Sequence, residues 1–341
     1  MSQKTTNLNL NVHYENTERN IKWLDGMDQN FEIIDDAIGD YFNSVISASN
    51  RIARSVDLSS VTTLSTTLQR ANKGMNCCAV GKYIYIFGGE VSPSSVYRFN
   101  TNDNTLSLLP LTLPIDCYSS CCEATRNKIY LFAINNGISG TDDILEFDID
   151  NNLISILELK MPFKVSYSSS FNVDNIFYIV GGKDENNEEK DTIIRFNPSA
   201  MTITTLEVSL PVELSSSVSK SYSDYGYIFG GISNSVTQNK IYKFDTTNNT
   251  ITELPITLVN SIYGFSIIKN NDDIYILGGF DGINYYSDIY KYNATEGTLT
   301  KLEMELPMPL ANACGSFRVS GFIFGGSNSN GTLSNILKFI E

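Results

Sequence analysis

Histidine, tryptophan and basic residues are scarce in this chain. It has one His, His13, and one Trp, Trp23, and its 24 Lys and Arg stand against 38 Asp and Glu, which gives a net charge of −14. A single His near the amino terminus excludes copper-radical oxidase chemistry, which needs His and Tyr ligands, and any His-based acid-base step beyond it. Without a clustered basic face the chain cannot neutralise phosphates, so we expect no nucleic-acid partner.

Long apolar segments are also absent. The first twenty residues hold no apolar core of signal-peptide length, and no run approaches the roughly 18 apolar residues of a membrane span. We therefore expect a soluble chain made in the cytosol, without membrane insertion. The hydrophobic content of 42% is sufficient for one large domain with an appendage.

Paired glycines divide most of the chain into repeats. Each pair follows a run of alternating β-branched and aromatic residues, and the pairs recur about every 48 residues. The pairs are Gly88-Gly89, Gly181-Gly182, Gly230-Gly231, Gly278-Gly279 and Gly325-Gly326. The first two pairs are about twice the repeat length apart, and the segment between them contains a degenerate copy. In this copy Phe132-Ala133 occupies the position of Phe87-Gly88. The chain thus holds six copies.

Each copy predicts four short strands. A segment of small residues comes first, and the run before the glycine pair, which has strand composition, is the second strand. The third strand ends in an aromatic residue followed by Asn or Asp, and in the fourth strand, as in 105–109, Thr and apolar residues alternate. Four antiparallel strands make one propeller blade. The glycines fit sharp bends beside a neighbouring blade, where a Cβ has no room and φ is positive.

These features resemble the kelch repeat, which has paired glycines after its second strand and a Tyr-containing third strand. The resemblance covers roughly the last four-fifths of the chain and implies an all-β fold, a six-bladed kelch-like β-propeller. One position departs from the kelch pattern, because the Trp usual in the fourth strand is aliphatic here. The aliphatic residues are Leu106, Ile154, Ile203, Ile251 and Leu299.

The sixth copy is incomplete at the carboxyl end. After Gly326 only a loop and a third strand, 335–340, remain. The segment 61–69 has the Thr/Leu alternation of the other fourth strands, so we expect it to complete blade six and close the ring. Closure removes the exposed sheet edges of an open array.

Three of the six cysteines occupy equivalent positions. Cys77, Cys122 and Cys314 each lie eleven residues before the glycine-pair position of their blade, in the first strand, which lines a propeller's axis. No CxxC motif or His accompanies them. We therefore interpret them as small residues in a crowded channel, and expect no disulfide, metal site or cofactor.

The segment 24–56 has a different period. Its apolar positions step alternately by three and four, a heptad seam that predicts an α-helical coiled coil between chains. We expect a homotrimer, with a dimer or a helix docked on its own propeller as alternatives. The predicted interface residues are Leu24, Met27, Phe31, Ile34, Ile38, Tyr41, Val45 and Ile52.

The preceding segment, 1–23, and the start of this helix resemble the amino-terminal attachment region of tail-fibre and receptor-binding proteins. Such proteins belong to phages and phage-derived bacteriocins of Gram-positive bacteria. The resemblance rests on the short Asn/Leu segment 5–10 and the D-x-N-F-x-x-I-D-x-A-I motif of 28–38. It implies an arm that plugs into a baseplate, which we assign to Leu8, Leu10, Tyr14 and Trp23. The propeller then spans 57–341.

The propeller sequence also argues against an enzyme. Kelch propellers include sialic-acid epimerases, but a carboxylate site would need converging guanidinium groups, and the ring has only five Arg. Pairs such as Asp142-Asp143 are more simply solvated loop carboxylates. We therefore assign no catalytic residues.

Propeller topology predicts where binding occurs. The chain enters the ring at the start of a fourth strand, so the long second-to-third loops and the fourth-to-first loops lie on the face away from that entry. Variable loops on a rigid scaffold carry function, and Tyr is a common contact residue. The candidate receptor-binding residues are Tyr118, Tyr167, Tyr263, Asp281, Asn284, Tyr285 and Tyr286.

The sequence therefore predicts a receptor-binding protein of a phage or phage tail-like bacteriocin. It would be made in the bacterial host cytoplasm and carried on a tail or baseplate, where its propeller binds a bacterial surface protein or polysaccharide. The alternatives are a stand-alone kelch interaction protein and, third, a sialic-acid-type sugar epimerase.

Overall fold

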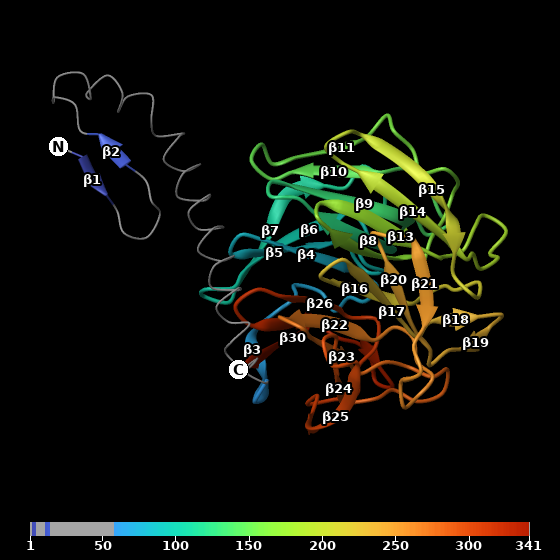
Figure 1. Ribbon diagram of the computed structural model, residues 1–341. Helices are drawn as coiled ribbons and strands as arrows, with labels where there is room; N and C mark the ends of the chain where they lie inside the picture. Colours follow the sequence, from blue (N-terminus) through green and yellow to red (C-terminus); the bar gives the residue numbers. More distant parts are fainter. Residues whose placement is uncertain (1, 5–10, 14–57, 341) are drawn as a thin grey trace. The chain divides into compact units, whose positions relative to one another are not determined.

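The computed structural model describes residues 2–4, 11–13 and 58–340, in two compact units, Met1–Ser55 and Val56–Glu341 (Figure 1). In the first unit β1 (Ser2–Lys4) pairs antiparallel with β2 (Asn11–His13). The predicted coiled-coil seam and the baseplate contacts Leu8, Leu10, Tyr14 and Trp23 lie outside the described residues. Among the described residues no helix is long and apolar enough to cross a membrane.

The second unit consists of six four-stranded antiparallel sheets, each one blade. Blade one is β4 (Asn76–Val80), β5 (Tyr83–Phe87), β6 (Ser95–Asn100) and β7 (Thr105–Thr112). Blade two is β8 (Ser119–Ala124), β9 (Lys128–Asn135), β10 (Leu145–Asp148) and β11 (Leu153–Ile156). Blade three is β12 (Ser169–Val173), β13 (Ile176–Val180), β14 (Thr192–Asn197) and β15 (Thr202–Ser209).

The other three blades follow the same order. Blade four is β16 (Val218–Tyr222), β17 (Tyr225–Phe229), β20 (Ile241–Asp245) and β21 (Thr250–Glu253). Blade five is β22 (Ser266–Asn270), β23 (Asp273–Leu277), β24 (Asp288–Asn293) and β25 (Thr298–Glu305). Blade six is β26 (Cys314–Phe317), β27 (Gly321–Phe324), β30 (Asn335–Ile340) and β3 (Ser60–Thr67).

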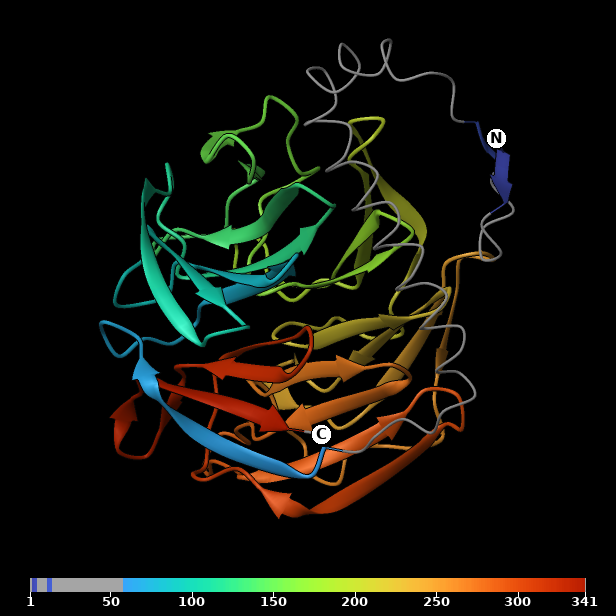
Figure 2. The same ribbon diagram turned by 90° about the vertical axis from the view of Figure 1, so that its left-hand side faces the viewer.

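The ring closes as the sequence predicts. β3 pairs antiparallel with β30, from Ser60 opposite Ile340 to Thr67 opposite Asn335, so the outermost strand of blade six comes from the front of the chain. Figure 2 shows the blue β3 lying along the red strands of this blade. The observed strand begins at Ser60, one residue before the predicted start at 61, and ends at Thr67, two residues before the predicted end at 69. All six blades therefore have four strands.

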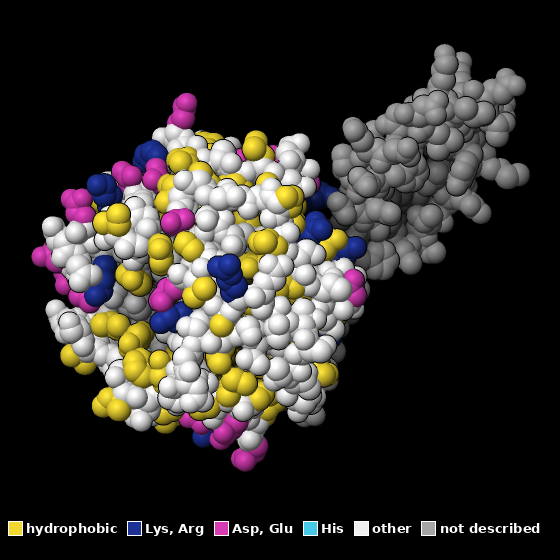
Figure 3. Space-filling view, turned by 180° about the vertical axis from the view of Figure 1, so that it is seen from behind, with side chains coloured by type: hydrophobic (Ala, Val, Ile, Leu, Met, Phe, Trp, Pro, Cys, Tyr) yellow, Lys and Arg dark blue, Asp and Glu magenta, His cyan; other side chains and the backbone are white. Residues whose placement is uncertain are grey.

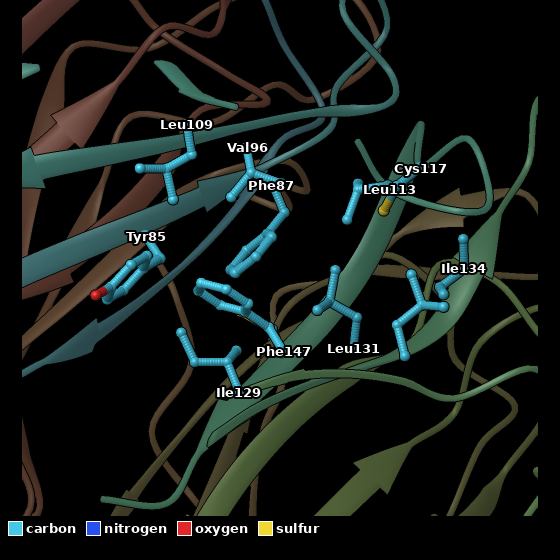
Figure 4. Close-up of a cluster of buried hydrophobic side chains, with 12 residues drawn as sticks. Tyr85, Phe87, Val96, Leu109, Leu113, Cys117, Ile129, Leu131, Ile134 and Phe147 are labelled. Atoms are coloured by element: carbon cyan, nitrogen blue, oxygen red, sulfur yellow. The ribbon is translucent and has the colours of Figure 1, made fainter. Parts of the chain in front are cut away.

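The core lies between blades. Six separate clusters of buried side chains each join two neighbouring blades. Between blades one and two, the rings of Phe87 and Phe147 meet edge to face with centroids 6.0 Å apart (Figure 4). The aliphatic residues at the kelch Trp position also pack here, since Leu106 contacts the cluster of blades six and one. Burial between blades fixes their angle and makes the ring rigid.

The glycine pairs make the same contact at five of the six interfaces. Gly88 has φ 64°, and a Cβ there would lie 2.1 Å from the carbonyl oxygen of Cys117 in the loop to the next blade. The Gly89 N–H donates to that same carbonyl at 2.7 Å. The equivalent acceptors for the other pairs are the carbonyls of Leu214, Ile262, Leu310 and Asn72. The predicted reason for the glycines is therefore confirmed.

Blade two departs from this pattern, as its sequence does. Ala133 has φ 51°, so it keeps the left-handed conformation of the first glycine despite its Cβ. Because no second glycine follows, β9 continues to Asn135, and β8 takes up the irregularity with a register shift between Ser119 and Cys121.

Two long second-to-third loops carry small hairpins. β18 (Ile232–Ser233) pairs with β19 (Val236–Thr237), and β28 (Ser327–Asn328) pairs with β29 (Gly331–Thr332). We call the face that bears these loops and the fourth-to-first loops the loop face. The opposite face, with the first-to-second and third-to-fourth turns, is the turn face.

Candidate functional site

A funnel of about 560 Å³ runs along the ring axis from the loop face. Its wall comes from the innermost strands of all six blades. Figure 1 shows five of them, β4, β8, β16, β22 and β26, around the middle of the ring. Most of the lining residues are small and polar, so the walls offer hydroxyl, thiol and amide groups. They include Asn76, Cys77, Cys122, Ser169, Ser170, Ser217, Ser219, Ser266 and Cys314. This volume lies within the usual range of small-molecule sites.

Three of the predicted tyrosines surround the mouth of the funnel. Tyr118, Tyr167 and Tyr263 all line it, each from the loop that leads into an innermost strand. The Tyr167 hydroxyl accepts a hydrogen bond from Asn135 Nδ2 at 2.9 Å, and the side chain is 39% exposed. A Cβ on Gly137 would lie 2.5 Å from the Tyr118 ring, so glycine lets this ring pack closely against the neighbouring loop. The topology thus brings these three residues together.

Tyr285 joins this group through an aromatic neighbour. The Phe280 ring packs against Tyr285 with centroids 4.5 Å apart and against Tyr263 at 5.7 Å. Sequence reasoning did not select Phe280. This residue directly follows Gly278-Gly279, the glycine pair of blade five, and so begins the loop that reaches the mouth. The three rings form a continuous aromatic surface from the mouth to the loop of blade five.

Asp281, Asn284 and Tyr286 lie in the same loop but outside the funnel lining. The Asp281 carboxylate accepts hydrogen bonds from the backbone N–H groups of Asn284 and Ile283, at 2.6 and 2.7 Å, and from the Tyr286 hydroxyl at 2.7 Å. These bonds stabilise the ionised carboxylate and lower the pKa of Asp281. Tyr286 is half-buried against the core of blades four and five. The arrangement fixes the loop and leaves Asn284 and Ile283 exposed at its tip.

The structure reveals three charged residues that sequence reasoning did not select. Glu123 of β8 and Lys220 of β16 line the deep end of the funnel, and Lys269 of β22 lies beside them. Burial raises the pKa of Glu123, against the opposing effects of Lys220, the Ser170 hydroxyl and Lys269. Burial and the charge of Lys220 lower the pKa of Lys269 to about 8. One signal in the sequence marks these residues: each is a charged residue in the first strand of a blade, where most other residues are small or apolar.

The cysteines line the funnel as free thiols. All six are unpaired, and Cys77, Cys122 and Cys314 lie in the funnel wall as predicted. The Cys78 thiol and burial together raise the pKa of Cys122, which therefore stays a poorly reactive thiol. In the part of the chain that the structure describes, no group of three or more His, Cys, Asp and Glu is placed to hold a metal ion.

Surface charge is mixed in sign. On the face shown in Figure 3, Lys and Arg side chains alternate with Asp, Glu and apolar side chains, and no basic patch forms there. Ion pairs such as Lys190 with Asp184, at 2.7 Å, place opposite charges side by side in the loops. Among the described residues that line the funnel, Lys220 carries the positive charge.

The fold and the axial funnel define the chain as a six-bladed β-propeller closed by a strand from its amino-terminal side. The model of the KLHDC2/KLHL20/DRC7 Kelch-repeats domain matches residues 74–256, more than half of the chain, so the chain belongs to the kelch-repeat family. The solved structure of YjhT has a TM-score of 0.70 at 15% sequence identity, over 80% of this chain and 96% of that chain, and shares the fold. Comparison with curated proteins gives no match.

Proposed function

We propose that the chain is a receptor-binding protein of a phage tail or a phage tail-like bacteriocin. The observation that carries this proposal is the separation of two faces. Ser60, the first residue of β3, pairs with Ile340, so the preceding chain enters blade six where the turn face begins. The long loops and the funnel mouth belong to the loop face. The propeller thus presents its long loops away from the point where the chain enters.

The loop face also suits contact with another molecule. Four of its six second-to-third loops expose an aliphatic side chain. The most exposed are Ile138, at 93%, and Ile283, at 84%, with Val236 at 60% and Val91 at 45%. Aliphatic tips around a tyrosine-lined funnel supply apolar and stacking contacts, while the walls supply hydrogen bonds.

The amino-terminal sequence supplies the other half of the proposal. Its attachment-like motif and heptad seam support anchoring to a baseplate and assembly as a homotrimer. Three loop faces on one stalk raise the avidity for a repetitive bacterial surface by orders of magnitude over one propeller. The protein would be made in the host cytoplasm and then carried on the virion or tail-like particle.

Assembly is tested by light scattering of the full chain, which we expect at three times 37.9 kDa. Aspartate at Ile34 and Ile38 would bury unpaired charges in the seam, so this double variant should be a folded monomer. A wild-type monomer at micromolar concentration would remove the stalk from the proposal.

Receptor binding is tested with labelled full chain on a panel of Gram-positive cells. Replacing Tyr118, Tyr167 and Tyr263 together by alanine should weaken binding at least about tenfold, because these rings surround the funnel mouth. Tyr222→Ala, on the turn face, is the matched control, and the melting temperature of each variant checks folding. Equal binding by the triple variant and the wild type would place the contact surface elsewhere.

We further propose that the protein is not an enzyme. The Glu123, Lys220 and Lys269 group is the feature of the described ring that most favours sugar chemistry instead, since a carboxyl group and an amine of lowered pKa lie in one channel. Turnover of a panel of acidic and neutral sugars, followed by nuclear magnetic resonance, decides the matter. Catalysis that is lost in Glu123→Gln would overturn the non-enzymatic assignment.

A further inference from the structure

Three charged side chains lie where the axial channel narrows. Glu123 and Lys220 line both the wide funnel and a second cavity of about 180 Å³. The second cavity is also lined by Asn172, Ser221 and Lys269, which stand nearer the turn-face ends of their strands. Because Glu123 and Lys220 border both spaces, they form the constriction between them. A ligand that fills the funnel from the loop face ends at this point.

The constriction groups are held by hydrogen bonds across blades. Ser170 Oγ of blade three donates to Glu123 Oε1 of blade two at 2.9 Å. Lys269 Nζ of blade five donates to the Ser221 carbonyl of blade four at 2.9 Å. These side chains come from four consecutive blades of a rigid ring, so their separation changes little when a ligand arrives.

The constriction has one more positive group than negative groups. Two ammonium groups, Lys220 and Lys269, face one carboxyl, Glu123. Both lysines lower the pKa of Glu123, while Lys220 lowers the pKa of Lys269 and Glu123 raises it. A buried charge without a counter-charge is unfavourable, so a further negative group would be stabilised here. Beside Lys220, Ser219 lines the funnel and is 3% exposed as a residue, and its hydroxyl makes no hydrogen bond within the described residues. It is an additional donor for a ligand.

We propose that the constriction binds one anionic group, a carboxylate or a phosphate, carried by a small polyhydroxylated ring that fills the funnel. The anion would lie against Lys220 and Lys269, with Ser219 as a further donor. The ring would contact the serine walls, with Tyr118 and Tyr263 at the mouth. This inference deepens the proposed function by naming the chemistry of the receptor group, and it rests on that function only for the source of the ligand.

The test is calorimetric titration of the full chain at pH 7 and constant ionic strength, with glucuronate, glucose 1-phosphate and glucose as probes. We expect glucuronate or glucose 1-phosphate to bind at least about tenfold more tightly than glucose, as a charge-assisted contact gives. The preferred probe distinguishes a carboxylate from a phosphate. Comparable affinity for glucose and both anionic probes, or no binding of any of them, would overturn the proposal.

Three variants test the location with opposite expected signs. Lys220→Met and Lys269→Met should each weaken binding of the anionic probe about tenfold or more, whereas Glu123→Gln should strengthen it because it removes the competing negative charge. Lys243→Met is the control for loss of one positive charge, since Lys243 lies over the Tyr225 ring, outside the channel. A merely structural role for these residues would weaken binding in all three channel variants. That pattern, or unchanged binding in both lysine variants, would refute the site.

The probe assay separates this inference from the proposed function. Binding of the anionic probe by a chain that attaches to no cells would refute the adhesin role and leave the anion site intact. Cell attachment that survives in Lys220→Met and Lys269→Met would keep the adhesin role and remove the anion site from receptor recognition.

Discussion

Replacing Lys269 by methionine should change the stability of the ring in a pH-dependent way. Burial and the charge of Lys220 lower the pKa of Lys269 from its ordinary 10.5 to about 8. Each unit of this difference corresponds to about 1.4 kcal/mol, so the buried ammonium lowers the free energy of unfolding by about 3 kcal/mol at neutral pH. The same side chain also gives a hydrogen bond to the Ser221 carbonyl, whose loss costs about 1 to 2 kcal/mol. The two effects oppose one another.

The sign of the pH effect follows from which state binds the proton. Between pH 8 and 10.5 the unfolded chain holds the Lys269 proton and the folded chain does not, so stability rises with pH in this window. Below pH 8 both states are protonated and the full penalty applies. Lys269→Met removes the penalty, and we expect it to be about 1 to 2 kcal/mol more stable than the wild type at pH 7. By pH 9.5 that advantage should fall by about 2 kcal/mol and vanish.

Urea unfolding followed by circular dichroism at pH 7, 8.5 and 9.5 measures this difference. The comparison is between variant and wild type, so ionisation of tyrosines elsewhere affects both alike. Lys243→Met controls for the change in net charge. A Lys269→Met difference that stays constant from pH 7 to 9.5 would refute the assignment of a buried, positively charged Lys269.

The glycine pairs and the closing strand lead to two further predictions. Ala133→Gly should raise the melting temperature slightly, since relief of the left-handed strain, about 1 to 2 kcal/mol, exceeds the entropy lost by glycine, about 1 kcal/mol or less. Gly181→Ala should lower the free energy of unfolding by at least about 2 kcal/mol, because the new Cβ would lie 2.2 Å from the Leu214 carbonyl oxygen. Equal melting temperatures for Ala133→Gly and Gly181→Ala would contradict both predictions. Deletion of 1–56 should leave a soluble propeller, whereas deletion of 1–72 removes β3 and exposes the edges of the sheet in blade six. Equal solubility and equal melting temperature of the two truncated chains would show that β3 does not close the ring.

The blades were predictable because their determinants are local. Alternation of apolar residues fixes each strand, and a glycine pair marks five of the six contacts with the next blade, so the period of the pairs counts the blades once the degenerate copy at Ala133 is included. Strand ends were less well predicted. β7 continues to Thr112, past the expected end at Leu109, although Pro110 lies within it. An outermost strand has one unpaired edge, where proline loses no ladder hydrogen bond.

The funnel mouth was predictable and its deep end was not. Topology places every fourth-to-first loop on one face, so Tyr118 and Tyr263 were expected to meet there. Glu123, Lys220 and Lys269 come from blades two, four and five, and each looks like an isolated charge in its own strand. Only the closed ring, with its six innermost strands around one axis, brings them together. Local sequence patterns carry no such information.

The lysines of the constriction link stability to binding. If an anion fills the site, it neutralises the charge that destabilises the ring, so its binding should be coupled to folding. The preferred anionic probe should then raise the melting temperature of the wild type more than that of Lys269→Met, which has already lost the destabilising ammonium. An apolar side chain at position 269 would give a more stable ring at neutral pH, because it removes the buried ammonium whose pKa is lowered. A buried ammonium is therefore understandable as a group kept for its ligand, and Lys269→Met, which stabilises the ring at neutral pH, should weaken the binding of the anionic probe about tenfold or more.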